Sequence, residues 1–262
     1  MNKIIAIYGP TTSNKLGLAL NLSKYIWGKY QIDPEIINAD SRKIYKGFIV
    51  SQSLPSESFL QEIETHLFGI ISPKEKLDLF GFQKLVKNKI IEIQQRGGLP
   101  ILVGGSTLHL LSILQNWKKG EKRAKKKLSS NILVFGIIIN KQALKKTVSK
   151  NVFQMFEKGL YEEFKKLYVE SRNNKVSKDL LKETLGYRQF LEMAQVSKKS
   201  PLKLQPKDLT RTKKWVNKDI LKYAYRQTLD YKRFQDIHLI RNFNQARKIV
   251  DVFLNKRGLP RE

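Results

Sequence analysis

The sequence predicts an α/β fold with a parallel sheet, followed by a mainly helical C-terminal portion. In the first half of the 262 residues, short apolar runs alternate with amphipathic segments. This alternation is typical of a parallel sheet with helices on its faces. After residue 140 the apolar residues recur at helical spacing instead. We therefore expect an α/β core over residues 1–139, with a basic linker over 118–130, and a helical part over 140–262 that packs on this core.

The expected elements follow from these patterns. Strands are predicted over Lys3–Tyr8, Glu35–Ala39, His66–Ile70, Leu99–Val103 and Asn131–Ile139. Helices are predicted over Leu16–Ile26, Asp78–Arg96 and a segment that begins between Gly104 and His109. The C-terminal part is predicted to hold helices over Gln142–Leu167, broken near Gly159, and over Asp179–Val196, Leu209–Phe234 and Asn244–Asn255.

A phosphate-type loop directly follows the first strand. Its residues are Gly9, Pro10, Thr11, Thr12, Ser13, Asn14 and Lys15. The spacing is that of a P-loop, with Asn14 in place of the second glycine and Leu16 in place of the Ser or Thr that binds Mg²⁺. Asn tolerates a left-handed backbone, so the loop shape can persist. The sequence therefore predicts a P-loop-type sheet with a site for a phosphate-bearing ligand. The alternative is that the loop is a chance turn between a strand and a helix.

Two further polar residues follow predicted strands. Asp40, with Ser41, comes after the second strand, at the edge where α/β folds place their sites. Its carboxylate could bind Mg²⁺ or act as a general base, or it could cap a helix that starts near Arg42. Ser106 follows Gly104 and Gly105, where its hydroxyl could face a ligand or simply cap a helix.

The composition favours a polyanionic partner. The chain has 50 Lys and Arg against 23 Asp and Glu, a formal net charge of +27. Nucleic acid is the first candidate and an anionic membrane surface the second, although drift of an AT-rich genome towards Lys also explains part of the excess. The absence of Cys excludes disulfides and Cys-zinc sites, and no apolar run reaches 18 residues. We expect a cytoplasmic protein that does not enter a membrane.

The predicted helix over Leu209–Phe234 combines cationic and aromatic residues. Such a helix suits a nucleic-acid surface, where cations contact phosphates and rings stack on bases. The alternative is an ordinary amphipathic helix whose aromatic residues belong to the core. The cationic and aromatic residues of this predicted helix are Lys213, Lys214, Trp215, Lys218, Lys222, Tyr223, Tyr225, Arg226, Tyr231, Lys232 and Arg233.

Seven motifs in the same order resemble the tRNA dimethylallyltransferase family, from residue 4 to about residue 234. They are Gly9–Leu16 (GPT-x-SGK-[TS]), Asp40–Gly47 (D-S-x-x-x-Y-K-G), Thr65–Ile70, Pro100–His109, Gln154–Glu163, Gly186–Gln189 and Ala224–Gln227. No single motif is decisive, but their order is specific.

The resemblance implies transfer of a dimethylallyl group from its diphosphate to N6 of the adenosine 3′ of the anticodon, in tRNAs that read UNN codons. It implies that residues Gly9 to Lys15 bind the diphosphate and that Asp40 and Ser106 are catalytic. The residues that it implies for binding the tRNA anticodon stem-loop are Ser41, Arg42, Tyr45, Lys46, Gly47, Arg188, Gln189, Arg226 and Gln227. It also implies Mg²⁺, which Leu16 puts in question. We expect a monomer.

This chain departs from the family pattern. Gly69 and His109 replace an Asp and a Tyr, and the arginines usual near Thr147 and Asn151 are missing. The family's helical insertion after His109 is reduced to the basic run Lys118–Lys127. Two alternatives therefore stay open. One is a catalytically impaired relative that binds tRNA, and the other is a P-loop nucleotide kinase or NTPase, against which Leu16 argues.

Overall fold

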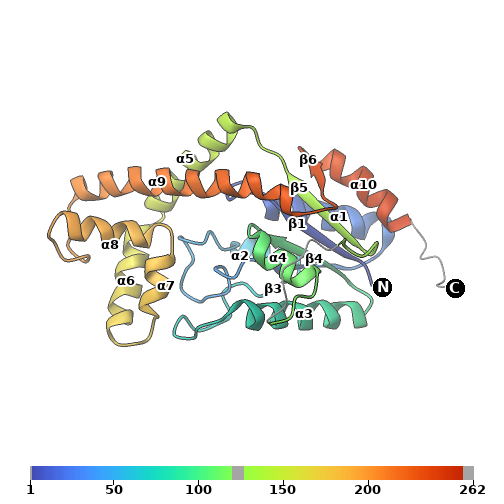
Figure 1. Cartoon of the computed structure of the whole chain (residues 1–262), viewed down its shortest axis with the longest axis horizontal. Helices are drawn as coiled ribbons and strands as arrows, with labels where there is room; N and C mark the ends of the chain where they lie inside the picture. Colours follow the sequence, from blue (N-terminus) through green and yellow to red (C-terminus); the bar gives the residue numbers. More distant parts are fainter. Residues whose placement is uncertain (1, 120–126, 256–262) are drawn as a thin grey trace.

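The protein is built on one six-stranded parallel sheet, as a computed structural model shows for residues 2–119 and 127–255 (Figure 1). The strand order is β3-β2-β4-β1-β5-β6. The strands are β1 Ile4–Tyr8, β2 Pro34–Asn38, β3 Thr65–His66, β4 Leu99–Gly104, β5 Ile132–Ile137 and β6 His238–Ile240. Every pairing is parallel, so all carboxyl ends lie at one edge. The parallel sheet predicted from the sequence is confirmed.

Helices cover both faces of the sheet. Helices α1 (Lys15–Tyr30) and α10 (Phe243–Asn255) pack on one face, where Ile5 and Ile101 point. Helices α3 (Leu79–Gln95) and α4 (Thr107–Leu114) pack on the other. The two covered faces account for the apolar runs in β1, β2 and β4, because these strands are buried on both sides.

The remaining helices form a layer that extends from the core (Figure 1). They are α5 Lys141–Glu157, α6 Leu160–Arg172, α7 Lys178–Glu183, α8 Tyr187–Val196 and the long α9 Pro206–Leu229, which a short 3₁₀ turn (Asp230–Arg233) follows. The short α2 (Glu57–Glu62) lies in the loop after β2. Helix α9 packs on α5 and α8 at one end and reaches the sheet edge at the other. None of the described helices is long and apolar enough to cross a membrane.

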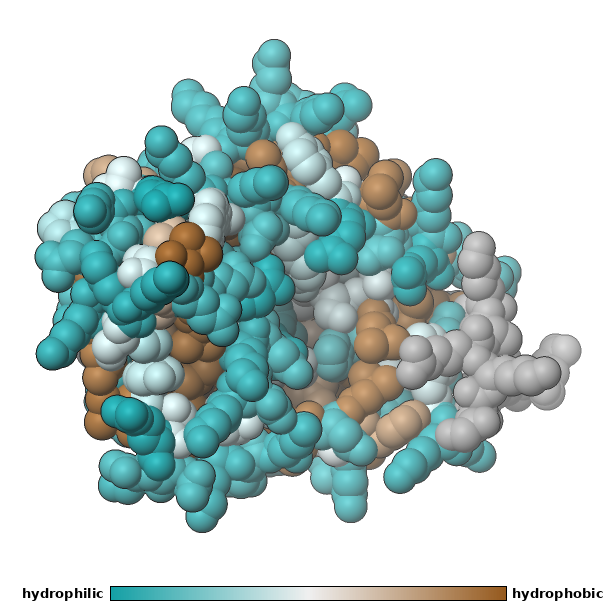
Figure 2. All heavy atoms as spheres, turned by 60° about the vertical axis from the view of Figure 1, so that its left-hand side comes forward, coloured by the Kyte–Doolittle hydropathy of each residue, from teal (hydrophilic) through white to brown (hydrophobic). Residues whose placement is uncertain are grey.

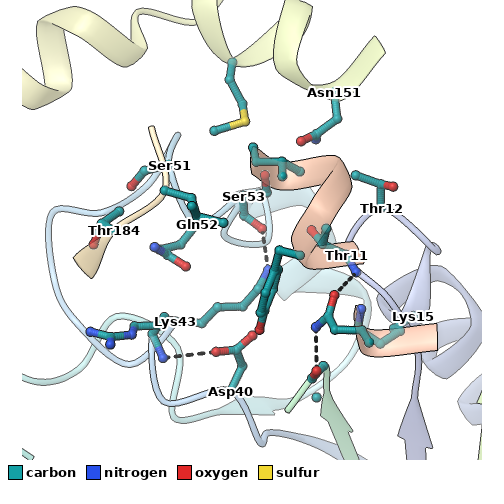
Figure 3. A pocket seen from close by; sticks show the side chains of 18 of the residues that line it. Thr11, Thr12, Lys15, Asp40, Lys43, Ser51, Gln52, Ser53, Asn151 and Thr184 are labelled. Carbon is teal, nitrogen blue, oxygen red and sulfur yellow. Dashed lines mark hydrogen bonds between the residues drawn. The ribbon is translucent and has the colours of Figure 1, made fainter. Parts of the chain in front are cut away.

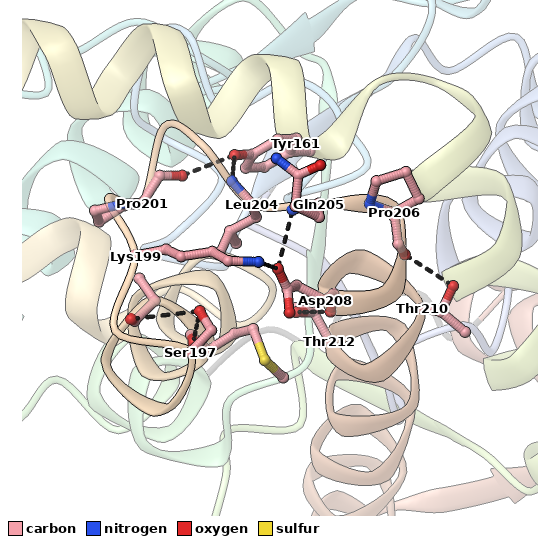
Figure 4. Close-up of polar contacts among 12 residues, drawn as sticks. Tyr161, Ser197, Lys199, Pro201, Leu204, Gln205, Pro206, Asp208, Thr210 and Thr212 are labelled. Carbon is pink, nitrogen blue, oxygen red and sulfur yellow. Dashed lines mark hydrogen bonds and ion pairs between the residues drawn. The ribbon is translucent and has the colours of Figure 1, made fainter.

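The connection between α8 and α9 is held by polar contacts (Figure 4). The Asp208 carboxylate accepts from the Lys199 ammonium at 2.7 Å and from the Gln205 backbone N–H at 3.0 Å. The Tyr161 hydroxyl accepts from the backbone N–H of Leu204 at 3.0 Å and donates to the carbonyl of Pro201 at 2.9 Å. These bonds fix the turn from which α9 starts.

Several sequence expectations need correction. The helix expected over Asp179–Val196 is two helices, because Gly186 adopts φ 101° and a Cβ there would lie 3.3 Å from Leu160. The strand expected over His66–Ile70 stops at His66, since Leu67 and Gly69 have positive φ. The alternative of a helix near Arg42 is wrong, because residues 41–44 form turns. Strand β6 and helix α2 were not predicted.

The two-part division at residue 139 stays a prediction. Strand β6 and helix α10 come from the second part but complete the sheet and its α1 face. In the basic linker, residues 120–126 lie outside the described residues.

Candidate active site

The phosphate loop keeps a P-loop shape despite its changed sequence. Asn14 has φ 54° and ψ 40° and directly precedes α1, so it adopts the left-handed conformation expected of it. Thr12 also has a positive φ of 66°. The loop thus presents backbone N–H groups and the positive end of a helix to one cavity, which is a general means of binding an anion.

Lys15 lies across this loop. Its ammonium donates to the carbonyl oxygens of Gly9 at 3.0 Å and Pro10 at 2.8 Å. Burial, and to a smaller degree the nearby charge of Lys43, lower the pKa of Lys15 to about 7, and the charge of Asp40 acts in the opposite direction. An anion bound in the loop would stabilise the charged form of Lys15.

Asp40 is held by the residue two positions before it. The Asn38 side chain accepts from the backbone N–H of Asp40 at 2.9 Å and donates to its carbonyl, also at 2.9 Å. The same amide donates to the carbonyl of Leu67 at 2.8 Å. The Asp40 carboxylate itself accepts from the backbone N–H of Arg42 at 3.1 Å and faces the cavity (Figure 3). One oxygen therefore has a fixed donor, and the carboxylate can still reach a ligand.

One cavity of about 1030 Å³ contains the phosphate loop, Asp40 and parts of α5 and α9. Seven cationic side chains and three carboxylates line it, so it suits an anionic ligand. The face of the molecule shown in Figure 2 is mostly hydrophilic. The cationic residues are Lys15, Arg42, Lys43, Lys150, Arg188, Lys222 and Arg226.

Gln227 joins α9 to two loops of the sheet edge. Its side-chain oxygen accepts from the backbone N–H of Thr11, and its nitrogen donates at 2.5 Å to the carbonyl of Gly105. The hydroxyl of Tyr8 donates to the Gln227 carbonyl at 2.7 Å. Gln227 is only 4% exposed, so its contacts are within the protein although it borders the cavity. These bonds position the phosphate loop, and a direct contact of Gln227 with tRNA stays a prediction.

Gln189 and Tyr45 are likewise buried. Gln189 is fully buried and donates to Asp219 at 2.7 Å, which in turn accepts from Arg188 at 2.9 Å. Gln189 therefore shares Asp219 with Arg188 and helps to orient it, and its predicted contact with tRNA stays a prediction. Tyr45 is 7% exposed, and its hydroxyl accepts from the backbone N–H of Leu77 at 3.3 Å, so it is a core residue.

Other predicted residues lie beside the cavity rather than on its wall. Ser106 caps α4, and its hydroxyl lies 2.8 Å from Nδ1 of His109. Ser13 is buried, and its hydroxyl has no hydrogen-bond partner among the described residues. The residues Gly9, Pro10, Ser41, Lys46 and Gly47 also do not line the cavity. Their predicted roles, and that of Ser106, stay predictions.

The opposite wall is formed by α5 and by the loop that follows Gly47. The Thr147 hydroxyl lies 3.2 Å from that of Thr12, and Lys150 and Asn151 line the cavity from the next turn. Lys150 was not predicted, because the motifs indicate only that the usual arginines are missing here. Helical spacing supplied the signal, since residues 147, 150 and 151 share one face of a helix.

Glu163 positions the loop on that wall. Its carboxylate accepts from the backbone N–H groups of Val50 at 2.6 Å and Ser51 at 2.9 Å, and from the hydroxyl of Tyr187. The loop continues through Gln52 and Ser53, which line the cavity (Figure 3). These bonds give a structural reason for a Glu at this place in the Gln154–Glu163 motif.

The described residues contain one group of three that could hold a metal ion, and it lies elsewhere. It consists of Glu35 in β2, Glu64 directly before β3 and His66 in β3. Asp40 follows the opposite end of β2, and Glu35 is already paired with Arg96 and with His66, the latter at 2.6 Å. This cluster is an ion-pair network remote from the cavity.

The fold and the site define a P-loop-type α/β protein whose cation-lined cavity is completed by C-terminal helices. The sequence model described as IPP transferase matches residues 43–130 and 118–233. The chain therefore belongs to the IPP transferase family, that of the tRNA dimethylallyltransferases. The resemblance described from the motifs is confirmed.

Individual relatives agree with this assignment. The chain is 27% identical to the tRNA dimethylallyltransferase of Oenococcus oeni over 90% of its own length and 87% of that protein. It is 25% identical to that of Acetivibrio thermocellus, over 95% and 96% of the two chains. The crystal structure of the tRNA isopentenylpyrophosphate transferase of Bacillus halodurans has the same fold, with a TM-score of 0.79 at 20% identity over 97% of this chain and 96% of that one.

Proposed function

We propose that this protein transfers a dimethylallyl group from dimethylallyl diphosphate to N6 of the adenosine 3′ of the anticodon in tRNAs that read UNN codons. The single observation that carries the proposal is the shared cavity. A phosphate loop with Lys15 and a ligand-facing carboxylate, Asp40, lie in the same cavity, and this cavity belongs to a chain of the IPP transferase family.

The loop would bind the leaving group. When the carbon–oxygen bond of dimethylallyl diphosphate breaks, negative charge grows on the departing diphosphate. Backbone N–H groups at the start of α1 and the Lys15 ammonium are fixed donors aimed at that place, and such preorganised donors stabilise the transition state. The proton that Lys15 needs at neutral pH is favoured by the bound anion itself.

Asp40 would act as the general base. The exocyclic N6 amine is a weak nucleophile, and its proton must leave as the new carbon–nitrogen bond forms. Asp40 faces the cavity and has a single backbone donor, so an oxygen can accept this proton. The adenosine must first leave its base stack, which costs about a few kcal/mol.

The tRNA would lie along the cationic rim. Lys214, Lys218, Lys222 and Arg226 recur at intervals of four on α9 and are exposed, and the last two border the cavity. Residues at this spacing share one helix face. Twelve residues of helix span about 18 Å, enough to follow several phosphates. This row would offset part of the cost of extruding the adenosine.

Mg²⁺, which the family resemblance implied, does not fit the residues present. Leu16 offers no hydroxyl at the position where a P-loop binds the ion. Two of the three carboxylates in the cavity are paired, Glu183 with Arg42 at 2.5 Å and Asp219 with Arg188. The third, Asp40, is close to two lysines. We therefore derive no step through a metal ion.

The proposal is tested by mass spectrometry of nucleosides from an unmodified UNN-reading tRNA incubated with the protein and dimethylallyl diphosphate. A dimethylallyl mass shift on adenosine is the expected result. No shift with tRNA binding retained would support an impaired relative that only binds tRNA. Binding of ATP in place of dimethylallyl diphosphate would instead support a nucleotide kinase.

A further inference from the structure

Lys43 is a cation inside the cavity that the proposed chemistry does not yet use. It lies three residues after Asp40, is half-buried, and donates to the carbonyl of Ser53 at 3.0 Å (Figure 3). Burial lowers the pKa of Lys43, and the charge of Asp40 opposes that effect. Its side chain is thus held in place by a loop that Glu163 fixes through Val50 and Ser51.

Lys43 and Lys15 form a pair of like charges on one anion site. Both line the cavity, and the charge of Lys43 lowers the pKa of Lys15, so the two ammonium groups repel one another. Asp40 can balance only one of them. Two half-buried cations beside one carboxylate are unfavourable in the empty site and become favourable when a polyanion enters.

The same arrangement disfavours a divalent cation. A Mg²⁺ ion in such a site usually combines one or two carboxylates with phosphate oxygens. Here the hydroxyl ligand is lost at Leu16, and the single unpaired carboxylate already faces two ammonium groups. A dication placed beside Asp40 would therefore meet two positive charges at close range.

We propose that Lys43 acts with Lys15 to neutralise the bound diphosphate, and that the two lysines supply the positive charge that a Mg²⁺ ion would otherwise supply. This inference rests on the proposed diphosphate site. It assigns to Lys43 direct contact with the diphosphate and makes binding of the diphosphate independent of the metal ion.

The test measures binding of inorganic pyrophosphate to the full chain by isothermal titration calorimetry, once in EDTA and once with Mg²⁺ in excess. Three variants accompany the wild type. Lys43→Gln removes the charge, Lys43→Arg keeps it, and Lys84→Gln removes the same charge from an exposed position on α3. Circular dichroism and melting temperature establish that each variant is folded.

The expected result has three parts. Wild type binds pyrophosphate in EDTA, with an affinity within about tenfold of that in Mg²⁺. Lys43→Gln weakens binding in EDTA by about tenfold or more, because it removes a charged hydrogen bond to the anion. Lys43→Arg and Lys84→Gln bind within about threefold of the wild type.

Other outcomes separate the two proposals. If the wild type binds pyrophosphate more than about tenfold better with Mg²⁺, or if Lys43→Gln binds as the wild type does in EDTA, the role of Lys43 is overturned while the diphosphate site stands. If the wild type binds no pyrophosphate under either condition, the proposed function fails with it. The comparison with and without Mg²⁺ uses only the wild type, so a strong requirement for Mg²⁺ would overturn the inference even if Lys43→Gln does not fold.

Discussion

The side-chain oxygen of Gln227 accepts a hydrogen bond from the backbone N–H of Thr11 at 2.8 Å, across 216 residues of sequence. This bond joins the basic helix α9 to the phosphate loop, and the same side chain also holds the loop after β4 through Gly105. A tRNA bound along α9 and a diphosphate bound in the loop would therefore be placed relative to each other by one buried amide.

Replacing Gln227 should weaken this junction. Gln227→Leu leaves the Thr11 N–H and the Gly105 carbonyl without their partner, and a buried unpaired polar group costs about 1–3 kcal/mol. We expect that loss in the free energy of unfolding by urea, together with weaker pyrophosphate binding. Gln195→Leu, at an exposed position of α8, is the control. Equal stability of both variants would show that Gln227 does not hold the loop.

Asp40 should be needed for transfer but not for binding. Asp40→Asn keeps the size of the side chain and removes the base, so the rate of transfer should fall by about 10²–10⁴. The affinity for tRNA, measured by filter binding, should change little, and the affinity for pyrophosphate, measured by calorimetry, should not fall, because a negative charge beside the two lysines is removed. Asp236→Asn, exposed after the 3₁₀ turn, is the matched control. A variant at Asp40 with full activity would exclude it as the base.

The pH dependence of the loop follows from Lys15. Its pKa is lowered from 10.5 to about 7 in the folded protein, chiefly by burial. Between these values the unfolded chain holds the proton and the folded chain does not, so this lysine makes stability rise with pH above 7. A bound anion requires the proton, so pyrophosphate affinity should fall as pH rises above 7.

Two titrations check this behaviour. Calorimetry in buffers of different ionisation enthalpy should reveal uptake of a proton when pyrophosphate binds at pH 8. The melting temperature of the wild type should rise between pH 7 and pH 9 relative to that of Lys15→Met. Two results together would place the pKa of Lys15 in its ordinary range. They are pyrophosphate binding without proton uptake, and melting temperatures of the wild type and Lys15→Met that change equally with pH.

The row of cations on α9 should set the salt dependence of tRNA binding. Each phosphate contact contributes roughly 0.7–0.9 to the slope of log K against log salt concentration. Replacing Lys214 and Lys218 together by Gln should therefore lower that slope by roughly 1.4–1.8. Lys248→Gln on α10 should leave it unchanged, since that exposed residue lies on the helix that covers the opposite end of the fold. An unaltered slope in the double variant would place the tRNA elsewhere.

The first half of the fold was predictable because its signals are local. Burial on both faces makes a strand such as Lys3–Tyr8 a continuous apolar run. Burial on one face gives a helix such as Asp78–Arg96 apolar residues at helical spacing. The break at Gly186 was missed because helical spacing continues across it, and the positive φ and the close approach of Leu160 that favour a glycine there appear only in the fold. Strand β6 is three residues long, too short to have a period.

Some residues of the site were predictable from local sequence, and the roles of others were not. Lys15 and Asp40 were predictable from a loop and a strand end, each within a few residues of sequence. The buried roles of Gln189 and Gln227 depend on partners in other elements, Asp219 and Thr11, which no local pattern identifies. Lys43 lay inside a recognised motif, yet its contact with Ser53 is formed by the folding of a loop with little regular structure.

The most direct test of the account locates the modification within the tRNA. An unmodified UNN-reading tRNA and a variant with guanosine in place of the adenosine 3′ of the anticodon are each incubated with the protein and dimethylallyl diphosphate. Nuclease fragments are then analysed by mass spectrometry. The account predicts a dimethylallyl mass shift confined to the fragment that contains that adenosine, and none in the guanosine variant. No shift in either tRNA, with both still bound, would contradict it.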